Sequence, residues 1–247
     1  MRPLIIILLL ITCFLLLRAN SYAKEELAAR LPQDEIDITA SYHGERLMIY
    51  GAVPKDADII AVVTSPKESL TMKMKGKVGP FWMDVKDIHF KNAPSMYKVH
   101  STRMISDILS IEKQEELGIG LHGLKKQIAD GAEERLTDEF IKLKNDEGLY
   151  SIKEGDIKIY KQKLFETYFY WPPKAPTGKY NIEVYAVRNG RVILHDTETL
   201  MVEKVGVEAF VSNLAKNNGM IYGILSVAIA IGSGFAVGIL FKGGGAH

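Results

Sequence analysis

The stretch GMIYGILSVAIAIGSGFAVGILF, residues 219–241, decides how the rest of this 247-residue chain is organised. It holds 23 residues without a charged side chain, and Lys242 follows it directly. At the helical rise of about 1.5 Å per residue it extends roughly 34 Å, which is enough to cross a bilayer with some tilt. We therefore predict a transmembrane helix over residues 219–241, followed by a short tail at 242–247.

Small residues recur at every fourth position within this span, at Ala230, Gly234 and Gly238. Such a stripe lies on one face of a helix and lets a second helix approach closely. It predicts a helix-partner face, although small residues are also common in membrane helices without a specific partner. The span contains no acidic or basic residue, so we expect no ion or proton pathway along it.

A second apolar segment begins the chain. Arg2 supplies a positive start, residues 3–17 form an apolar run, and Ser21 and Ala23 fit the −3 and −1 positions of a cleavage site. This pattern predicts a secretory signal peptide over residues 1–23, with an uncleaved signal anchor as the alternative. An exported start followed by one span predicts a periplasmic domain outside the inner (plasma) membrane and a cytoplasmic C-terminus.

The region between the two apolar ends is nearly neutral. Three of the 31 Lys and Arg residues lie in the ends, which leaves 28 basic against 30 acidic residues, a net charge of −2. A nucleic-acid binder needs a basic face, so we expect no nucleic-acid partner. Cys13 is the only cysteine and falls in the predicted signal peptide. The mature chain should therefore have no disulfide, thiolate metal site or cysteine nucleophile.

Two regions in which apolar and polar residues alternate, 34–100 and 150–205, predict β-strands. Asn189-Gly190 is the strongest hairpin signal, because both residues tolerate the positive φ of a type I′ turn. Gly79-Pro80 predicts another turn. Tyr180, just after a turn, resembles the tyrosine corner of immunoglobulin-like sandwiches.

Between these regions, residues 102–148 are rich in Glu, Lys, Leu and Ile and predict helices. We expect one helix from Ser106 to Leu117 and a second that begins near Asp130 with a capping box and ends at Gly148. Helices laid over a β core are the favoured arrangement, and a partner-docking helical arm is the alternative. His122, between glycines, is expected in a loop.

The predicted fold is therefore mainly β. It is an immunoglobulin-like β-sandwich over residues 24–206 with a helical insertion at about 102–148. A juxtamembrane helix over 207–218 then leads to the single C-terminal transmembrane helix.

Soft metal ligands gather in the first β region. Six of the nine methionines and three of the six histidines fall between residues 43 and 104, namely Met48, Met72, Met74, Met83, Met96, Met104, His43, His89 and His100. In an exported protein without cysteines these residue types could bind copper, and a periplasmic copper-handling protein is the alternative function. No compact cluster is present and Met also fills gaps in cores, so we favour packing and predict no metal or cofactor.

Catalytic patterns are absent from the sequence. A hydrolase needs a nucleophile, a base and an orienting group within reach of one another. Neither a Gly-x-Ser-x-Gly elbow nor a His-Glu-x-x-His motif occurs. We predict no catalytic residues and do not expect an enzyme.

Several short motifs occur in one order along the chain: Phe81-Trp82-Met83, Ala93-Pro94-Ser95-Met96-Tyr97, Asp146-Glu147-Gly148-Leu149-Tyr150, Leu164-Phe165, Pro176-Thr177-Gly178-Lys179-Tyr180, and Lys204-Val205-Gly206 leading to Tyr222-Gly223. Through them the chain resembles the Alph_Pro_TM family of transmembrane proteins, first grouped in alpha-proteobacteria. The family has no assigned catalytic residues, so none are carried over. Its members are thought to be encoded near sulfite-exporter-like permeases, which implies an accessory role beside a transporter.

These observations lead to one functional hypothesis. The chain is expected to be a membrane-anchored, periplasm-facing binding or scaffold protein and an accessory partner of a membrane transporter, such as a sulfite or other anion exporter. Its expected partners are the lipid bilayer and an integral membrane protein, a permease, contacted through the transmembrane helix and the β domain.

Overall fold

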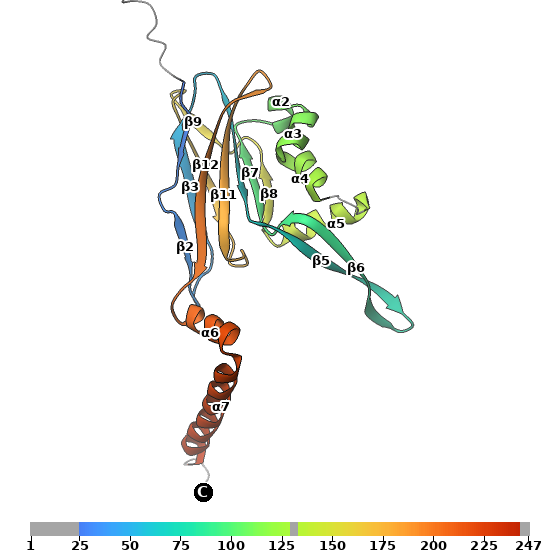
Figure 1. Ribbon diagram of the computed structural model, residues 1–247, viewed down its shortest axis with the longest axis vertical. Helices are drawn as coiled ribbons and strands as arrows, with labels where there is room; N and C mark the ends of the chain where they lie inside the picture. Colours follow the sequence, from blue (N-terminus) through green and yellow to red (C-terminus); the bar gives the residue numbers. More distant parts are fainter. Residues whose placement is uncertain (1–24, 129–132, 243–247) are drawn as a thin grey trace, which may run out of the picture.

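The computed structural model describes residues 25–128 and 133–242. The predicted signal peptide at 1–23 with Cys13, the expected capping residue Asp130, and the tail beyond Lys242 lie outside the described residues. The described chain has a β domain with helices along one side, a long two-stranded ribbon, and two C-terminal helices that leave the domain at one end (Figure 1).

Two sheets form the body of the β domain. The smaller sheet has the order β1-β3-β10-β9, with β1 Ala28–Arg30, β3 Glu45–Ala52, β10 Leu164–Trp171 and β9 Lys158–Tyr160. The larger sheet has the order β2-β12-β11-β4-β7-β8, with β2 Glu35–Ile38, β12 Arg191–Lys204, β11 Gly178–Arg188, β4 Asp58–Thr64, β7 Tyr97–Ser101 and β8 Tyr150–Lys153. Pairing is antiparallel except between β2 and β12 and between β7 and β8.

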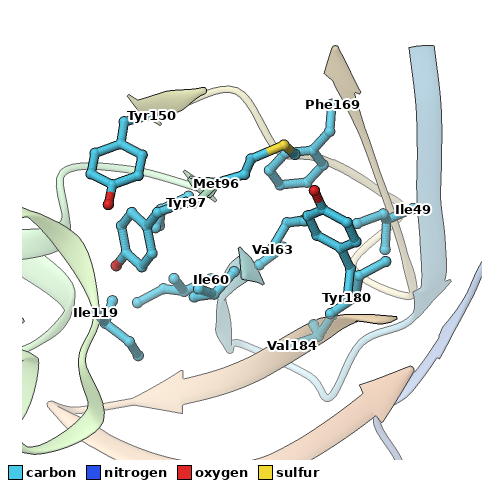
Figure 2. Close-up of a cluster of buried hydrophobic side chains, with 14 of the residues drawn as sticks. Ile49, Ile60, Val63, Met96, Tyr97, Ile119, Tyr150, Phe169, Tyr180 and Val184 are labelled. Carbon is cyan, nitrogen blue, oxygen red and sulfur yellow. The ribbon is translucent and has the colours of Figure 1, made fainter. Parts of the chain in front are cut away.

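Aromatic side chains join the two sheets into a sandwich. Trp171 on β10 packs edge-on against Tyr180 on β11, with ring centroids 4.7 Å apart. Phe169, also on β10, stacks on His100 of β7 at 3.8 Å. Figure 2 shows Phe169 in one apolar cluster with Tyr180, and both side chains are fully buried. Large rings therefore bridge the two sheets, and aliphatic side chains such as Ile49, Val63 and Val184 pack around them.

Four helices, between β7 and β8, cover the other face of the larger sheet: α2 Ile105–Ile108, α3 Ile111–Leu117, α4 Gly120–Ile128 and α5 Glu134–Asp146. The Tyr97 hydroxyl on β7 donates a hydrogen bond of 2.8 Å to the carbonyl of Gly118. In Figure 2, Ile119 lies on the same side of the cluster as Ile60 of β4 and Tyr97. Strand β4 is thus covered on both faces, which explains why its whole apolar run, residues 59–63, is buried.

The prediction of one helix from Ser106 to Leu117 is wrong. Leu109 has extended dihedral angles (φ −134°, ψ 140°) that end α2, and the Ser110 side chain caps α3 by accepting a hydrogen bond from the Lys113 amide. Gly118 ends α3 in a left-handed conformation, as expected, but α4 begins two residues later. His122 therefore lies on a helix and not in a loop.

The ribbon, residues 67–94, consists of β5 Lys67–Val78 and β6 Phe81–Pro94, joined at the predicted Gly79-Pro80 turn. At about 3.3 Å per residue, β5 is roughly 40 Å long. The base of the ribbon is packed, because Phe90 is buried and stacks on Phe140 of α5 at 4.3 Å. Its distal half projects away from the sandwich (Figure 1).

Two local predictions are confirmed. Asn189 and Gly190 both have positive φ, 51° and 76°, and connect β11 to β12 as a hairpin. The Tyr180 hydroxyl donates a 2.6 Å hydrogen bond to the Pro176 carbonyl four residues upstream, which is the bond of a tyrosine corner.

The fold class is confirmed as mainly β with helices and one C-terminal apolar helix. With the ribbon and the four helices treated as insertions, β1-β3-β10-β9 follows the ABED order of an immunoglobulin sandwich, and β12-β11-β4-β7-β8 follows the order GFCC′C″. The parallel pairing of β8 with β7 departs from an all-antiparallel sandwich. The immunoglobulin-like assignment therefore stays a prediction.

Tyr180→Phe tests the corner bond. We expect it to lower the free energy of unfolding by about 1–2 kcal/mol, because the variant leaves the Pro176 carbonyl without its partner. Tyr42→Phe is the control, since the 3.5 Å contact of the Tyr42 hydroxyl to the Trp171 carbonyl is much longer than the Tyr180 bond. Urea unfolding of the detergent-solubilised chain measures both variants, and equal losses would contradict a special role for Tyr180.

Candidate functional site

The C-terminal helix α7, Gly219–Lys242, stands apart from the β domain (Figure 1). Residues 219–239 have a mean hydropathy of 2.0, and none of the most apolar window is buried by the described chain. The two serine hydroxyls of the span bond to helix carbonyls, Ser226 to Tyr222 at 2.8 Å and Ser233 to Ala230 at 3.0 Å. A helix with these properties suits hydrocarbon, where each polar group needs a partner within the protein.

One face of α7 is a shallow groove. Ala230, Gly234 and Gly238, the predicted helix-partner face, lie in it together with the larger residues Ile231, Phe235 and Ile239. Apart from its chain neighbours and the nearby backbone of the helix, a β-carbon added at Gly234 or Gly238 would meet no atom of the described chain within 4 Å. Phe235 and Ile239 are 70% and 72% exposed. The small residues form the floor and the large ones a ridge, the surface that ridges-into-grooves helix packing uses. That a partner helix binds there stays a prediction.

Helix α6, Gly206–Asn217, connects the sandwich to α7 and has two different faces. Ser212, Asn213 and Lys216 line a polar cleft against the ends of β11 and β12. Val207 and Phe210 are exposed. A helix with a polar face toward the domain and an apolar face away from it suits the surface of a membrane. This agrees with the predicted juxtamembrane position, which no direct observation tests.

The candidate copper ligands are spread over several elements. Met96, just before β7, and His100 on β7 are buried, whereas Met83 on β6 and Met104 before α2 are exposed. Met72 and Met74 are partly buried on β5 and pack against the core, and Met48 is partly buried on β3.

The three candidate histidines have different neighbours. His43 contacts the Ser41 carbonyl and His89 contacts the Thr71 hydroxyl. His100 is paired inside the core with Thr167. Within residues 25–128 and 133–242, no group of three or more His, Cys, Asp or Glu side chains is arranged to hold a metal ion. The copper hypothesis therefore gains no support from where these residues lie.

A polar cluster inside the sandwich was not predicted from the sequence. His100 Nδ1 lies 2.6 Å from Thr167 Oγ1 on β10 and 2.9 Å from Asp156 Oδ2. Both contacts use the same ring nitrogen. A proton relay needs the carboxylate on one ring nitrogen and the hydroxyl on the other. The contacts of His100 therefore pin the segment before β9 to both sheets and do not form a catalytic relay.

Burial lowers the pKa of two bases on β7, His100 and Lys98. Burial lowers the pKa of His100 to about 4, against the opposing effect of the Asp156 carboxylate, while Lys153 and Lys98 lower it further. Burial, with Lys153 nearby, lowers the pKa of Lys98 to about 8. The Lys98 ammonium donates a 2.7 Å hydrogen bond to the Gly148 carbonyl, where α5 gives way to β8. Because its pKa is lowered to about 4, His100 is neutral at physiological pH.

Sequence reasoning also missed the exposure of the ribbon tip. Phe81 and Trp82 are 68% and 72% exposed, although they are among the largest apolar residues of the chain. The available signal was the run Phe81-Trp82-Met83 directly after Gly79-Pro80. Large apolar residues beside a tight hairpin turn have little neighbouring chain to cover them.

Within residues 25–128 and 133–242, a β-rich domain is followed by one exposed, apolar C-terminal helix long enough to cross a membrane, which fits a single-pass membrane protein. The family described as "Putative transmembrane protein (Alph_Pro_TM)" has a model that matches residues 26–243, and the chain belongs to that family. No curated protein matches the chain.

The pKa of His100 predicts how stability depends on pH. In the unfolded chain His100 has a pKa of 6.5 and is protonated below that pH. In the folded chain its pKa is about 4, so it stays neutral down to that pH. We therefore expect the free energy of unfolding to fall by on the order of 2–3 kcal/mol as pH drops through that window. Thermal unfolding at a series of pH values measures this fall.

The matched variant is His100→Asn, whose amide can replace Nδ1 as a donor but does not titrate. It should be less stable than the parent at neutral pH, because it loses the stacking on Phe169, and it should show a flatter decline between pH 6.5 and 4. An unchanged slope would assign the decline to other groups.

Proposed function

We propose that the protein is a membrane-tethered, extracytoplasmic binding or scaffold module that works with an integral membrane protein. The observation that carries the proposal is the groove of α7, where the small residues Ala230, Gly234 and Gly238 lie beside a ridge of large ones and no described part of the chain fills the space. Hydrocarbon fills such a surface loosely, whereas a second helix packs into it closely.

The orientation follows from the two ends of the sequence. A signal peptide over residues 1–23 exports the β domain to the periplasm, and α7 then crosses the inner membrane with its C-terminus in the cytoplasm. The apolar side of α6, with Val207 and Phe210, rests on the outer surface of that membrane. The domain is held beside the extracytoplasmic surface of its partner.

The partner is a transporter, and the role is non-catalytic. The family resemblance implies a genomic neighbourhood with sulfite-exporter-like permeases, and on that ground an anion exporter is the proposed partner. The single ring nitrogen shared by both contacts of His100 supports a structural role for the cluster of His100, Thr167 and Asp156. In this proposal the β domain supplies a binding surface and α7 supplies the attachment.

The groove is tested with two double variants. Gly234→Leu with Gly238→Leu fills it, and Ser233→Leu with Ala236→Leu adds similar bulk on the opposite side of the helix. After crosslinking in intact membranes and affinity purification of the tagged chain, the groove variant should retain on the order of tenfold less of the partner, and the control should retain it fully. Equal recovery with both variants would remove α7 as the contact.

The orientation is tested with single cysteines in a Cys13→Ser background. A cysteine at Lys158, which is exposed on β9, should react with a membrane-impermeant maleimide in cells whose outer barrier has been opened. A cysteine at Gly245 should react only after the inner membrane is lysed. The reverse pattern would place the β domain in the cytoplasm and overturn the proposed topology.

A further inference from the structure

The distal half of the ribbon exposes a cluster of large apolar side chains. Its members lie on both strands beside the turn and are all at least 45% exposed: Val78, Phe81, Trp82, Met83 and Val85. Trp82, at 72%, and Phe81, at 68%, are the most exposed large apolar residues that the structure describes in the β domain. We call these five residues the tip. A domain that remained in water would gain nothing from presenting them on a long projection.

Positive charge flanks the tip. The ribbon, residues 67–94, holds six lysines and three acidic residues, whereas the whole region between the apolar ends of the sequence has a net charge of −2. Lys73, Lys75 and Lys77 alternate along β5 with half-buried residues and lie exposed on its outer face. One of them, Lys73, lies 3.4 Å from Asp84 across the ribbon. Aromatic residues next to exposed lysines are typical of segments that bind anionic membrane surfaces.

The ribbon also extends toward the expected level of the membrane surface. It slants from the sandwich toward the end of the molecule from which α6 and α7 emerge, and its tip reaches the level of α6 along the long axis (Figure 1). Because α7 begins directly after α6 and crosses the bilayer, the level of α6 is the level of the lipid headgroups. A side chain at the tip therefore meets the same membrane surface at some lateral distance from the span.

We propose that the tip inserts into the headgroup and upper acyl region of the bilayer that α7 spans. Trp82 and Phe81 take the interfacial position that aromatic side chains prefer, and the lysines of β5 contact anionic lipid phosphates. Lipid, rather than a protein partner, is favoured by the position of the tip at headgroup level and by the flanking positive charge. The domain then has two attachments, α7 and the ribbon, which fix its tilt over the membrane. This inference requires α7 to span but does not require the partner protein.

The test uses tryptophan fluorescence, since the chain has only two tryptophans and Trp171 is fully buried. The full chain is reconstituted into vesicles of equal parts phosphatidylcholine and phosphatidylglycerol, without other proteins. The phosphatidylcholine is brominated either near the carbonyl end or near the methyl end of its acyl chains. Subtracting the emission of the Trp82→Phe variant isolates Trp82.

We expect the bromine near the carbonyl end to lower Trp82 emission roughly twofold, and the deeper bromine to lower it less, as for a side chain at the boundary of headgroups and acyl chains. Quenching of Trp82 by aqueous iodide without quenching by either brominated lipid would overturn the proposal. Protection of Trp82 from both iodide and bromine would also overturn it, because the tip would then be covered by protein, such as a second copy of the chain.

The charged part is tested with Lys75→Gln and Lys77→Gln together. These residues lie on the exposed face of β5, so the variant should fold as the parent does. The variant should lose part of the bromine quenching in the anionic vesicles and behave as the parent does in pure phosphatidylcholine. Equal quenching of variant and parent in both vesicles would contradict a role for lysine–phosphate attraction.

Discussion

The uncovered apolar surface of α7 limits how the other described parts of the chain can be placed relative to a membrane. No described part of the chain covers this helix, and its serine hydroxyls are already bonded to its own carbonyls, so its favourable surrounding is hydrocarbon. Once α7 crosses a bilayer, α6 is fixed at the membrane surface and β12, which precedes it, must end there. The long axis of the β domain then points toward the membrane. In this orientation the ribbon extends toward the lipid headgroups, whereas in solution its exposed end would have no such surface to contact.

A different constraint applies to the β domain, because both faces of its larger sheet are apolar around β4 and must be covered by other elements. Strand β4 lies in the middle of that sheet between β11 and β7, with the smaller sheet on one side and the α2–α5 helices on the other. Rings join the layers: Trp171 to Tyr180, and Phe169 to His100 between the sheets, and Phe90 to Phe140 between the ribbon and α5. The ribbon is rooted in this core through Phe90 and stays exposed only beyond it. The packed base holds the ribbon in a fixed direction, so that its exposed end can contact a surface outside the β domain.

Local signals allowed much of this architecture to be predicted from the sequence. The turns at Asn189-Gly190 and Gly79-Pro80, the corner at Tyr180 and the face of Ala230, Gly234 and Gly238 each depend on a few neighbouring residues or on helical periodicity. The break at Leu109 was missed because Ser106 and Ser110 are equally good helix caps by residue type. The cluster of His100, Asp156 and Thr167 could not be found, because its members are distant in sequence and only the sheet topology unites them. The exposure of the ribbon could not be predicted either. The alternation of Met and Lys along β5 is the same pattern that a strand inside a sandwich would show.

We propose that α7 spans the membrane with its groove against a partner helix. Photocrosslinking residues placed singly along α7 in native membranes test it most directly, at Ile231, Phe235 and Ile239 beside the groove and at Leu225 and Ile229 on the other side. We expect adducts with one polytopic membrane protein from the three groove positions and lipid adducts alone from the other two. Lipid adducts alone at all five positions would contradict the claim.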